Sequence, residues 1–419
     1  MAVKSTAWIM GMGAPLLAIA QARAEDSIGF AHESYVEDHA RMTVQTETVR
    51  VHGTLSPSLD LTLRGVYDGI SGATPVGAPA INQLTLRNPR THSPIPSAAI
   101  TGFIRPLDGI SGASPATQVT PRFTVPLSQS HDIRRGVDVA PGLSWEENRF
   151  VPELSYSKEH DYISYAVAFN YSREMNEKNT TLNVGWAHSY DQVLSNQFTY
   201  LKHRASKNSD DLILGVSQLL GPGTIFSANG TFSHEAGYLN DPYRSVVFDE
   251  TNLDANARVI LDGEKRPSSR DSQALLLSLT QAVPALNASV EGTYRYYHDS
   301  YDIMANTFGL AWFQKFATTL VVSPSFRYYR QDAARFYAIQ FPGDPANDPG
   351  RAPRYYSSDY RLSSLQTFTL GLEANIKLHE QWDFHLGYQR YWMRGLDHKT
   401  LQVTYPSANI FTVGLSFNY

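Results

Sequence analysis

The sequence predicts an all-β fold: a transmembrane, antiparallel, up-and-down β-barrel of about 16 strands with a long extracellular or luminal loop. Three observations support this fold class. Runs of about ten to thirteen residues alternate apolar with small or polar side chains, and this is the length that a tilted strand needs to cross a bilayer. Short turns alternate with long polar loops along the chain. The 419 residues include 24 Tyr, 19 Phe and 6 Trp, and aromatic residues form girdles at both interfaces of membrane barrels.

The strand expected at 367–378 shows the alternation most clearly. Phe368, Leu370 and Leu372 share one face, whereas Thr369 and the residues in step with it share the other. The same pattern recurs at 162–172, 180–190 and 410–419. A soluble sandwich can also alternate in this way, but its strands are typically shorter and its polar face carries more charge. The membrane barrel is therefore the preferred interpretation.

The connections between the strands predict the direction of each strand. Short turns are expected near 56–57, 221–223, 284–285, 314–315 and 379–380. Long loops are expected at about 69–132, 192–210, 236–270, 332–362 and 395–407. Bacterial barrels keep short turns on the periplasmic side and long loops outside. Strands at about 27–36 and 42–53 then complete a count of sixteen.

Both ends of the sequence indicate export to the bacterial outer membrane. Lys4, an apolar run at 6–20 and the small-x-small sequence at 22–24 predict a signal peptide over residues 1–24, cleaved after Ala24. The alternative is a membrane anchor, but the run is shorter than the roughly 20 residues of a spanning helix. The mature barrel is then 25–419. Its last strand ends in an aromatic residue, which is similar to the signal that the barrel-assembly machinery reads. Outer-membrane lipid and that machinery are therefore expected partners.

Composition and spacing exclude several kinds of site. The chain has no Cys, which removes disulfides and thiolate metal sites, and its net charge of −5 provides no basic field for nucleic acid. None of the 13 His has the spacing of a metalloprotease helix. His160-Asp161 and His298-Asp299 could touch a cation, but solvated polar turns are the simpler interpretation. Without a metal site or a nucleophile elbow, we expect no enzymatic activity.

Charged residues on the polar faces of the strands are expected to line the barrel interior. The set comprises Asp60, Arg64, Glu153, Glu291, Arg295, Arg327, Glu373, Lys377, Asp383 and His385. Because both signs are present, one interpretation is a hydrated wall of paired charges. The other is a charged constriction that selects a solute. The expected 69–132 loop is rich in Pro, Gly, Ser and Thr, so it is a candidate plug for the lumen.

One octapeptide occurs twice within that loop. Asp68-Gly-Ile-Ser-Gly-Ala-Thr-Pro75 returns as Asp108-Gly-Ile-Ser-Gly-Ala-Ser-Pro115. Its Gly-rich sequence favours recurrent tight turns. The motif also resembles the target of periplasmic flavin transferases, Asp-x-x-Ser/Thr-Gly-Ala-Ser/Thr. That resemblance implies covalent FMN on Thr74 and Ser114, with Asp68 and Asp108 opening the two motifs, so that the flavin would supply redox chemistry.

Several stretches together resemble an uncharacterised family of bacterial outer-membrane β-barrel proteins, catalogued as domain of unknown function 3570. They lie at 35–38, 68–75, 159–164, 179–182, 327–331 and 356–362. The resemblance covers nearly the whole mature chain. It implies a barrel whose genes often neighbour those of a flavin transferase, a thioredoxin-like protein and a small lipoprotein. The second octapeptide departs from the single copy expected in the family.

Three functional hypotheses follow from these observations. The first is a channel or transport protein, and the second is a component that supports redox work in the envelope, with FMN as its cofactor. The alternative to both is a plugged structural or adhesive barrel with neither activity.

Overall fold

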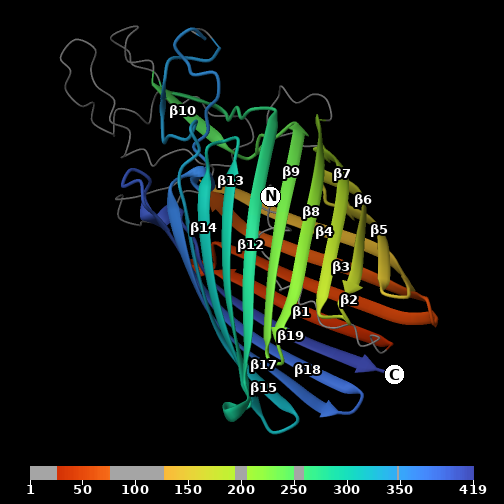
Figure 1. The fold of residues 1–419 in the computed structure, drawn as a ribbon. Coiled ribbons are helices and arrows are strands. Elements are labelled where there is room, and N and C mark those ends of the chain that lie inside the picture. The colour runs from red at the N-terminus through yellow and green to blue at the C-terminus, as the bar shows by residue number, and fades with distance from the viewer. Residues whose placement is uncertain (1–25, 76–126, 194–204, 250–258, 347–348) are drawn as a thin grey trace, which may run out of the picture.

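The computed structural model describes residues 26–75, 127–193, 205–249, 259–346 and 349–419. Within them, sixteen antiparallel strands form a closed barrel in which the first strand pairs with the last (Figure 1). This confirms the predicted fold class. The barrel strands are β1 (Ser27–Glu37), β2 (Met42–Ser56), β3 (Leu59–Pro75), β4 (Leu127–Trp145), β5 (Asn148–Lys158), β6 (Tyr162–Met175), β7 (Thr180–Val193), β8 (Ala205–Gly221), β9 (Thr224–Gly237), β12 (Ser269–Val283), β13 (Ala288–Asp299), β14 (Met304–Phe316), β15 (Leu320–Gln331), β17 (Leu365–His379), β18 (Trp382–Gly395) and β19 (Ser407–Asn418).

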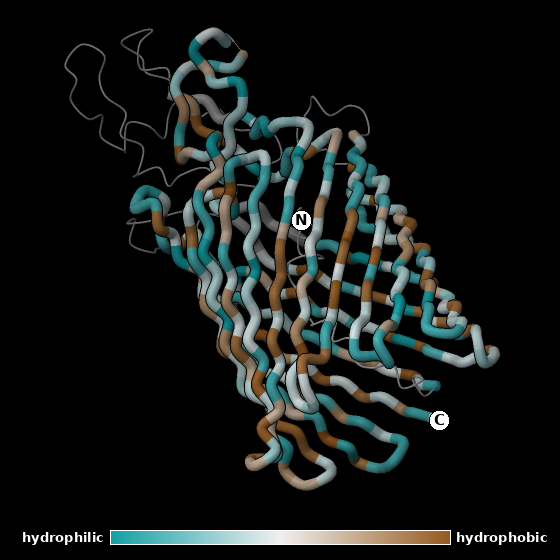
Figure 2. The backbone as a smooth tube through the Cα atoms, in the orientation of Figure 1, coloured by the Kyte–Doolittle hydropathy of each residue, from teal (hydrophilic) through white to brown (hydrophobic). Residues whose placement is uncertain are grey.

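The outer wall of the barrel exposes large apolar side chains at alternate positions. Phe308 and Leu310 of β14 are 50% and 55% exposed, and Leu370 and Leu372 of β17 are 52% and 53% exposed. Figure 2 shows hydrophobic and hydrophilic positions alternating along the strands. Water would disfavour such a surface, whereas lipid tails match it. In the described part of the chain, no helix is long and apolar enough to span a bilayer.

The two ends of the barrel differ in the length of their connections. We call the end with short turns, such as 57–58, 146–147 and 222–223, the turn end. The opposite loop end carries the long connections 238–268 and 332–364. These contain a three-stranded sheet of β10 (Ser245–Asp249), β11 (Val259–Gly263) and β16 (Phe341–Pro342), and β10 rises beyond the barrel in Figure 1. Short 3-10 segments occur at Asp38–Ala40, Pro284–Leu286, Tyr360–Leu362 and Gln402–Thr404.

Three expected boundaries need correction. The loop expected at 192–210 ends earlier, because β8 begins at Ala205. β14 continues through Gln314 and Lys315 to Phe316, so this turn lies at 317–319. The expected loop at 69–132 is shorter, because β3 has 17 residues and β4 has 19, and they pair as far as Pro75 and Leu127. At about 3.3 Å per residue, both strands are longer than the bilayer is thick and extend past it. The connecting residues lie outside the described ranges.

The first octapeptide is consequently part of a strand, and its interpretation as a turn is wrong. All residues of 68–75 pair with β4. Gly72 has φ of +125°, and a Cβ there would lie 2.3 Å from the Arg41 carbonyl oxygen, so the position requires glycine. The copy at 108–115 lies outside the described residues.

Most buried apolar side chains gather at the loop end, although Val66 and Ile70 of β3 are also buried. One cluster joins Tyr297 and Tyr301 to Phe336, Tyr360 and Tyr405. A second holds Val246, Phe248, Phe341 and Tyr356 and packs the small three-stranded sheet together. The two longest described loops are thereby fixed to each other and to the top of β13.

Candidate functional site: the lumen and its loop end

A cavity of about 390 Å³ lies inside the barrel below the 238–243 segment. Its lining comes from β3 to β9, β12, β13 and the loop. Glu153 of β5 and Arg295 of β13 line it from strands that lie six positions apart in the barrel order. Most other lining side chains bear a hydroxyl or a charged group. The cavity is therefore polar, and its size suits a small solute.

On the wall formed by β3 to β9, most cationic side chains have carboxylate partners. Arg64 Nε lies 3.5 Å from Asp138 Oδ2, and Arg134 Nε lies 2.9 Å from Asp68 Oδ2. The remaining pairs are Arg149 with Asp60 at 2.6 Å and Lys207 with Asp191 and Glu235, each at 3.6 Å. This wall has the arrangement of a hydrated surface of paired charges.

The wall formed by β13 to β15 is different. Arg295 and Arg327 lie on the faces opposite the exposed side chains of Tyr296 and Phe326. The Arg295 guanidinium is 5.2 Å from the ring centroid of Tyr297, and that of Arg327 is 5.8 Å from the ring of Tyr329. Neither arginine forms an ion pair with any described residue.

The other residues predicted to face the lumen have mainly neutral partners. Glu291 is 6% exposed, and the Thr280 hydroxyl lies 3.5 Å from its carboxylate. The Gln389 amide donates to Glu373 at 3.5 Å, and Lys377 lies opposite Asp383 in the β17–β18 register. Further contacts join Glu153 to Ser155, Asp383 to Asn418 and His385 to Asn375.

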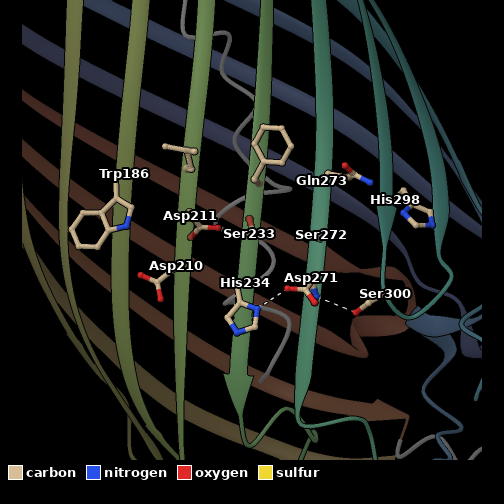
Figure 3. A pocket seen from close by; sticks show the side chains of 12 residues that line it. Trp186, Asp210, Asp211, Ser233, His234, Asp271, Ser272, Gln273, His298 and Ser300 are labelled. Carbon is tan, nitrogen blue, oxygen red and sulfur yellow. Dashed lines mark hydrogen bonds and ion pairs between the residues drawn. The ribbon is translucent and has the colours of Figure 1, made fainter.

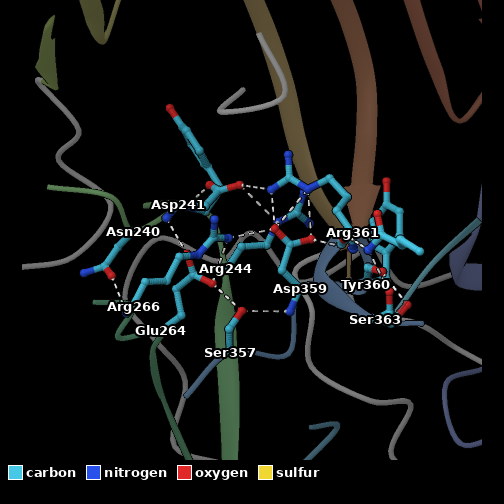
Figure 4. A network of polar contacts seen from close by, with 12 residues as sticks. Asn240, Asp241, Arg244, Glu264, Arg266, Ser357, Asp359, Tyr360, Arg361 and Ser363 are labelled. Carbon is cyan, nitrogen blue, oxygen red and sulfur yellow. Dashed lines mark hydrogen bonds and ion pairs between the residues drawn. The ribbon is translucent and has the colours of Figure 1, made fainter. Parts of the chain in front are cut away.

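A buried ionic network connects the two long loops at the loop end (Figure 4). We call it the loop clasp, and it comprises Asp241, Arg244, Glu264, Arg266, Ser357, Asp359 and Arg361. Arg361 Nη2 lies 2.6 Å from Asp241 Oδ2 across 120 residues of sequence, and Arg266 Nη2 lies 2.8 Å from Asp359 Oδ2. Ser357 donates to Glu264 at 2.5 Å. Three guanidiniums and three carboxylates thus compensate one another.

Burial and opposite charge compete within the loop clasp. Burial alone would raise the pKa of Asp359, but Arg361 and Arg244 outweigh it and hold that pKa well below its usual value. The same competition, with Arg244 and Arg361 dominating, lowers the pKa of Asp241 to about 2. Burial prevails at Glu264, whose pKa is raised despite Arg266. Nothing in the sequence pointed to 241–266, although 356–362 was among the stretches that carry the family resemblance.

The two His-Asp pairs differ in part from the solvated turns that we expected, because both aspartates are buried whereas His160 is exposed. Asp161 is 7% exposed and receives a hydrogen bond from the Tyr243 hydroxyl, and burial followed by Asp132 raises its pKa. Asp132, Glu159 and Asp161 each place one oxygen within 4.8 Å of the others, so they are the described residues that could hold a cation. Asp299 is 1% exposed and its Oδ2 lies 2.5 Å from Arg270 Nη2.

A groove of about 570 Å³ lies on the outer wall towards the loop end (Figure 3). It contains the His234–Asp271 pair, at 2.6 Å, and the neighbouring His188–Asp210 pair lies at 2.9 Å. Trp186 also lines the groove. These polar pairs lie at the loop-end limit of the apolar band, where lipid tails give way to headgroups.

The residues predicted to carry FMN are only partly described. Asp68 is buried and paired with Arg134, and the backbone of Thr74 pairs with Ser128 in the sheet. Asp108 and Ser114 lie outside the described residues. Covalent FMN at Thr74 or Ser114 stays a prediction.

Several solved outer-membrane proteins are similar to this chain. The siderophore receptor PirA from Pseudomonas aeruginosa is 9% identical with a TM-score of 0.41, over 94% of this chain and 61% of the receptor. A bacterial polysaccharide outer membrane secretin is 8% identical with a TM-score of 0.46, over 94% and 98% of the two chains. OccK5 (OpdH) from Pseudomonas aeruginosa is 8% identical with a TM-score of 0.43, with the same coverage. The chain thus spans about three fifths of PirA.

No curated protein is significantly similar to the chain. Its sequence nevertheless matches a recognised family over residues 11–401, nearly its full length. The chain is an outer-membrane-type β-barrel and belongs to the family described as "Protein of unknown function (DUF3570)".

Proposed function

We propose that this protein is a channel through which small polar solutes cross the bacterial outer membrane. The observation that carries the proposal is the polar cavity inside the barrel, which Glu153 and Arg295 line from separate parts of the wall. A barrel of sixteen strands is wide enough for an aqueous lumen. Because the loop clasp fixes the long loops at the loop end, solutes would enter past a firmly shaped mouth.

Conductance of the purified full chain in planar bilayers tests this proposal. We expect discrete current steps in potassium chloride and swelling of proteoliposomes in small sugars. A correctly folded barrel with neither response would favour the alternative, a plugged structural or adhesive barrel. Folding is checked independently by the shift in gel mobility on heating that is typical of membrane barrels.

Export is part of the same proposal. The signal peptide would be removed after Ala24, and the barrel-assembly machinery would insert the mature chain into the outer membrane. Amino-terminal sequencing of protein from the outer-membrane fraction should begin at Glu25. A mature protein that retains residues 1–24 would contradict the predicted cleavage.

Redox support through covalent FMN requires a separate test. Because Thr74 lies in a paired strand, a periplasmic flavin transferase would have to act before the barrel closes, and a thioredoxin-like protein would be a further partner. Peptides spanning Thr74 and Ser114 should then carry the mass of FMN in cells that contain the transferase. Unmodified peptides from such cells would rule out this role.

A further inference from the structure

The strand between Arg295 and Arg327 has small side chains on its inward face. Arg295 lies opposite Thr307 of β14, and Arg327 lies opposite Gly309. The other inward positions of this part of β14 are Ala305 and Ala311. The other inward side chains beside these positions are Thr293, whose hydroxyl lies over Gly309, and Tyr329, which lies opposite Thr307. Neighbouring strands are about 4.8 Å apart, so β13 and β15 are roughly 10 Å apart.

The two arginines are held in position by their neighbours. Each packs against the tyrosine two residues further along its own strand, and both tyrosines are buried, at 6% and 8% exposure. Tyr297 donates to Asp299 at 2.8 Å, and Tyr329 donates to Gln331 at 2.5 Å. The rings are thereby fixed, and they orient the guanidinium planes while leaving N–H groups available to a ligand.

Arg295 and Arg327 place two like charges on the same part of the inner wall. Two partly buried cations without an anion are costly, and a guanidinium fits a carboxylate with two parallel hydrogen bonds. A ligand with acidic groups would relieve the repulsion and complete the hydrogen bonding. Among the described residues, Arg50 is also luminal and without an ion pair, but it is exposed, and its neighbour Arg64 is already engaged by Asp138.

We propose that Arg295 and Arg327 form a luminal binding site for small organic anions that carry carboxylates, with dicarboxylates bound more tightly than monocarboxylates. The inference rests on the proposed channel function, because it names the class of solute that the channel would favour. The two guanidiniums lie diagonally across β14, with Arg295 opposite Thr307 and Arg327 opposite Gly309, and each can take one carboxylate of a short diacid.

Calorimetric titration of the detergent-solubilised full chain with succinate and with acetate tests the site without requiring transport. We expect succinate to bind more tightly than acetate, and R295Q and R327Q each to weaken succinate about tenfold or more, as loss of a charged hydrogen-bonding pair implies. R327K should retain part of the affinity, because lysine keeps the charge but not the fork. Gel mobility on heating checks that each variant is folded.

Two controls carry the same substitution elsewhere. Arg330 lies on the outer wall of β15, three residues beyond Arg327, and Arg50 is the luminal arginine without a second free guanidinium beside it. R330Q and R50Q should leave succinate affinity unchanged. Equal affinity in R295Q, R327Q and the unmodified protein would overturn the site, as would tighter binding of inorganic phosphate than of succinate.

Bilayer currents separate this inference from the proposed function. Succinate should reduce the potassium chloride current of the unmodified protein, and R327Q should abolish that reduction while still conducting. Conductance that is insensitive to succinate would leave the channel intact and refute the site. Succinate binding without any conductance would leave the site intact and refute the channel.

Discussion

The loop clasp and the wall of β13 to β15 both remove arginines from bulk water, but the arginines have different partners in the two places. In the clasp, Arg361 contacts Asp359 and Asp241, and Arg266 contacts Asp359 and Glu264. On the barrel wall, Arg327 packs against a tyrosine ring and has no carboxylate partner in the described part of the chain. An arginine whose donors are already used stabilises structure, whereas one held by an aromatic ring remains available to a ligand.

Removing one carboxylate should affect the clasp most. D359N would leave Arg244, Arg266 and Arg361 facing only two carboxylates in a buried site. Breaking a buried network in this way typically costs about 3–5 kcal/mol. Hydrogen exchange measured by mass spectrometry should show that loops 238–268 and 332–364 lose protection by about that amount, with the barrel strands unchanged.

The matched control for D359N is an exposed ion pair at the same end of the barrel, between loop 332–364 and the β13–β14 connection. Arg335 and Asp302 lie 3.5 Å apart with side chains 49% and 60% exposed. D302N should therefore cost less than about 1 kcal/mol. If both variants changed protection equally, the clasp would not be the element that holds the loops.

The second-largest expected effect is that acid weakens the loop clasp. The pKa of Asp241 is lowered to about 2, and Asp359 is also lowered, so the stability that they contribute is present above the usual pKa of about 3.9. It is lost as pH falls from about 4 to about 2, and for Asp241 this amounts to about 2–3 kcal/mol. The contribution of Glu264 to stability has the opposite sign, because its raised pKa lowers the stability of the loop clasp as the pH rises.

Pepsin cleavage within 238–268 and 332–364 measures this acid dependence. Cleavage of the unmodified protein should increase as the pH falls from 4 to 2. The D241N variant should be cleaved rapidly throughout that range, because the stability that Asp241 contributes is already lost. Cleavage that stays constant with pH in the unmodified protein would contradict the assignment of depressed carboxylates to the clasp.

The smallest expected effect concerns the aromatic support of the unpaired arginines. Y329L removes the ring against which Arg327 packs, whereas Y329F keeps the ring and removes only the hydroxyl that donates to Gln331. A cation–π contact is worth about 1 kcal/mol, so Y329L should weaken succinate up to about fivefold. Calorimetry should show Y329F close to the unmodified protein. Equal losses in both variants would assign the effect to the hydroxyl.

The strands were predictable because lipid on one side and water on the other impose an alternation that any sequence must show. The expected strand at 367–378 lies within β17, and the expected strand at 27–36 lies within β1. The first octapeptide was wrongly interpreted as a turn because its Gly-rich sequence also favours tight turns. In the barrel, Asp68 is paired with Arg134 and Gly72 fits against the Arg41 carbonyl, and neither partner is close in sequence.

The sites depend even more on distant partners. The inward orientation of Arg327 follows from its place in an alternating strand, but its freedom depends on the small side chains that β14 places beside it. The clasp joins Asp241 to Arg361 across two loops, which no local pattern could indicate. The alternation in the sequence therefore establishes whether a residue faces the lumen or the lipid. The packed fold decides whether a charged residue already has a partner of opposite charge.

Arg244, Asp241 and Asp359 are almost completely buried, each 1% exposed, and this affects how the protein responds to changes in salt concentration. Dissolved ions screen charges over about 10 Å at 0.1 M and about 3 Å at 1 M, but only where water reaches. The mouth should keep one shape in fresh water and in brine, while attraction of acids to the wetted arginines fades as salt rises. The shape of the mouth and the attraction of acids would thus respond independently to the salt concentration of the medium.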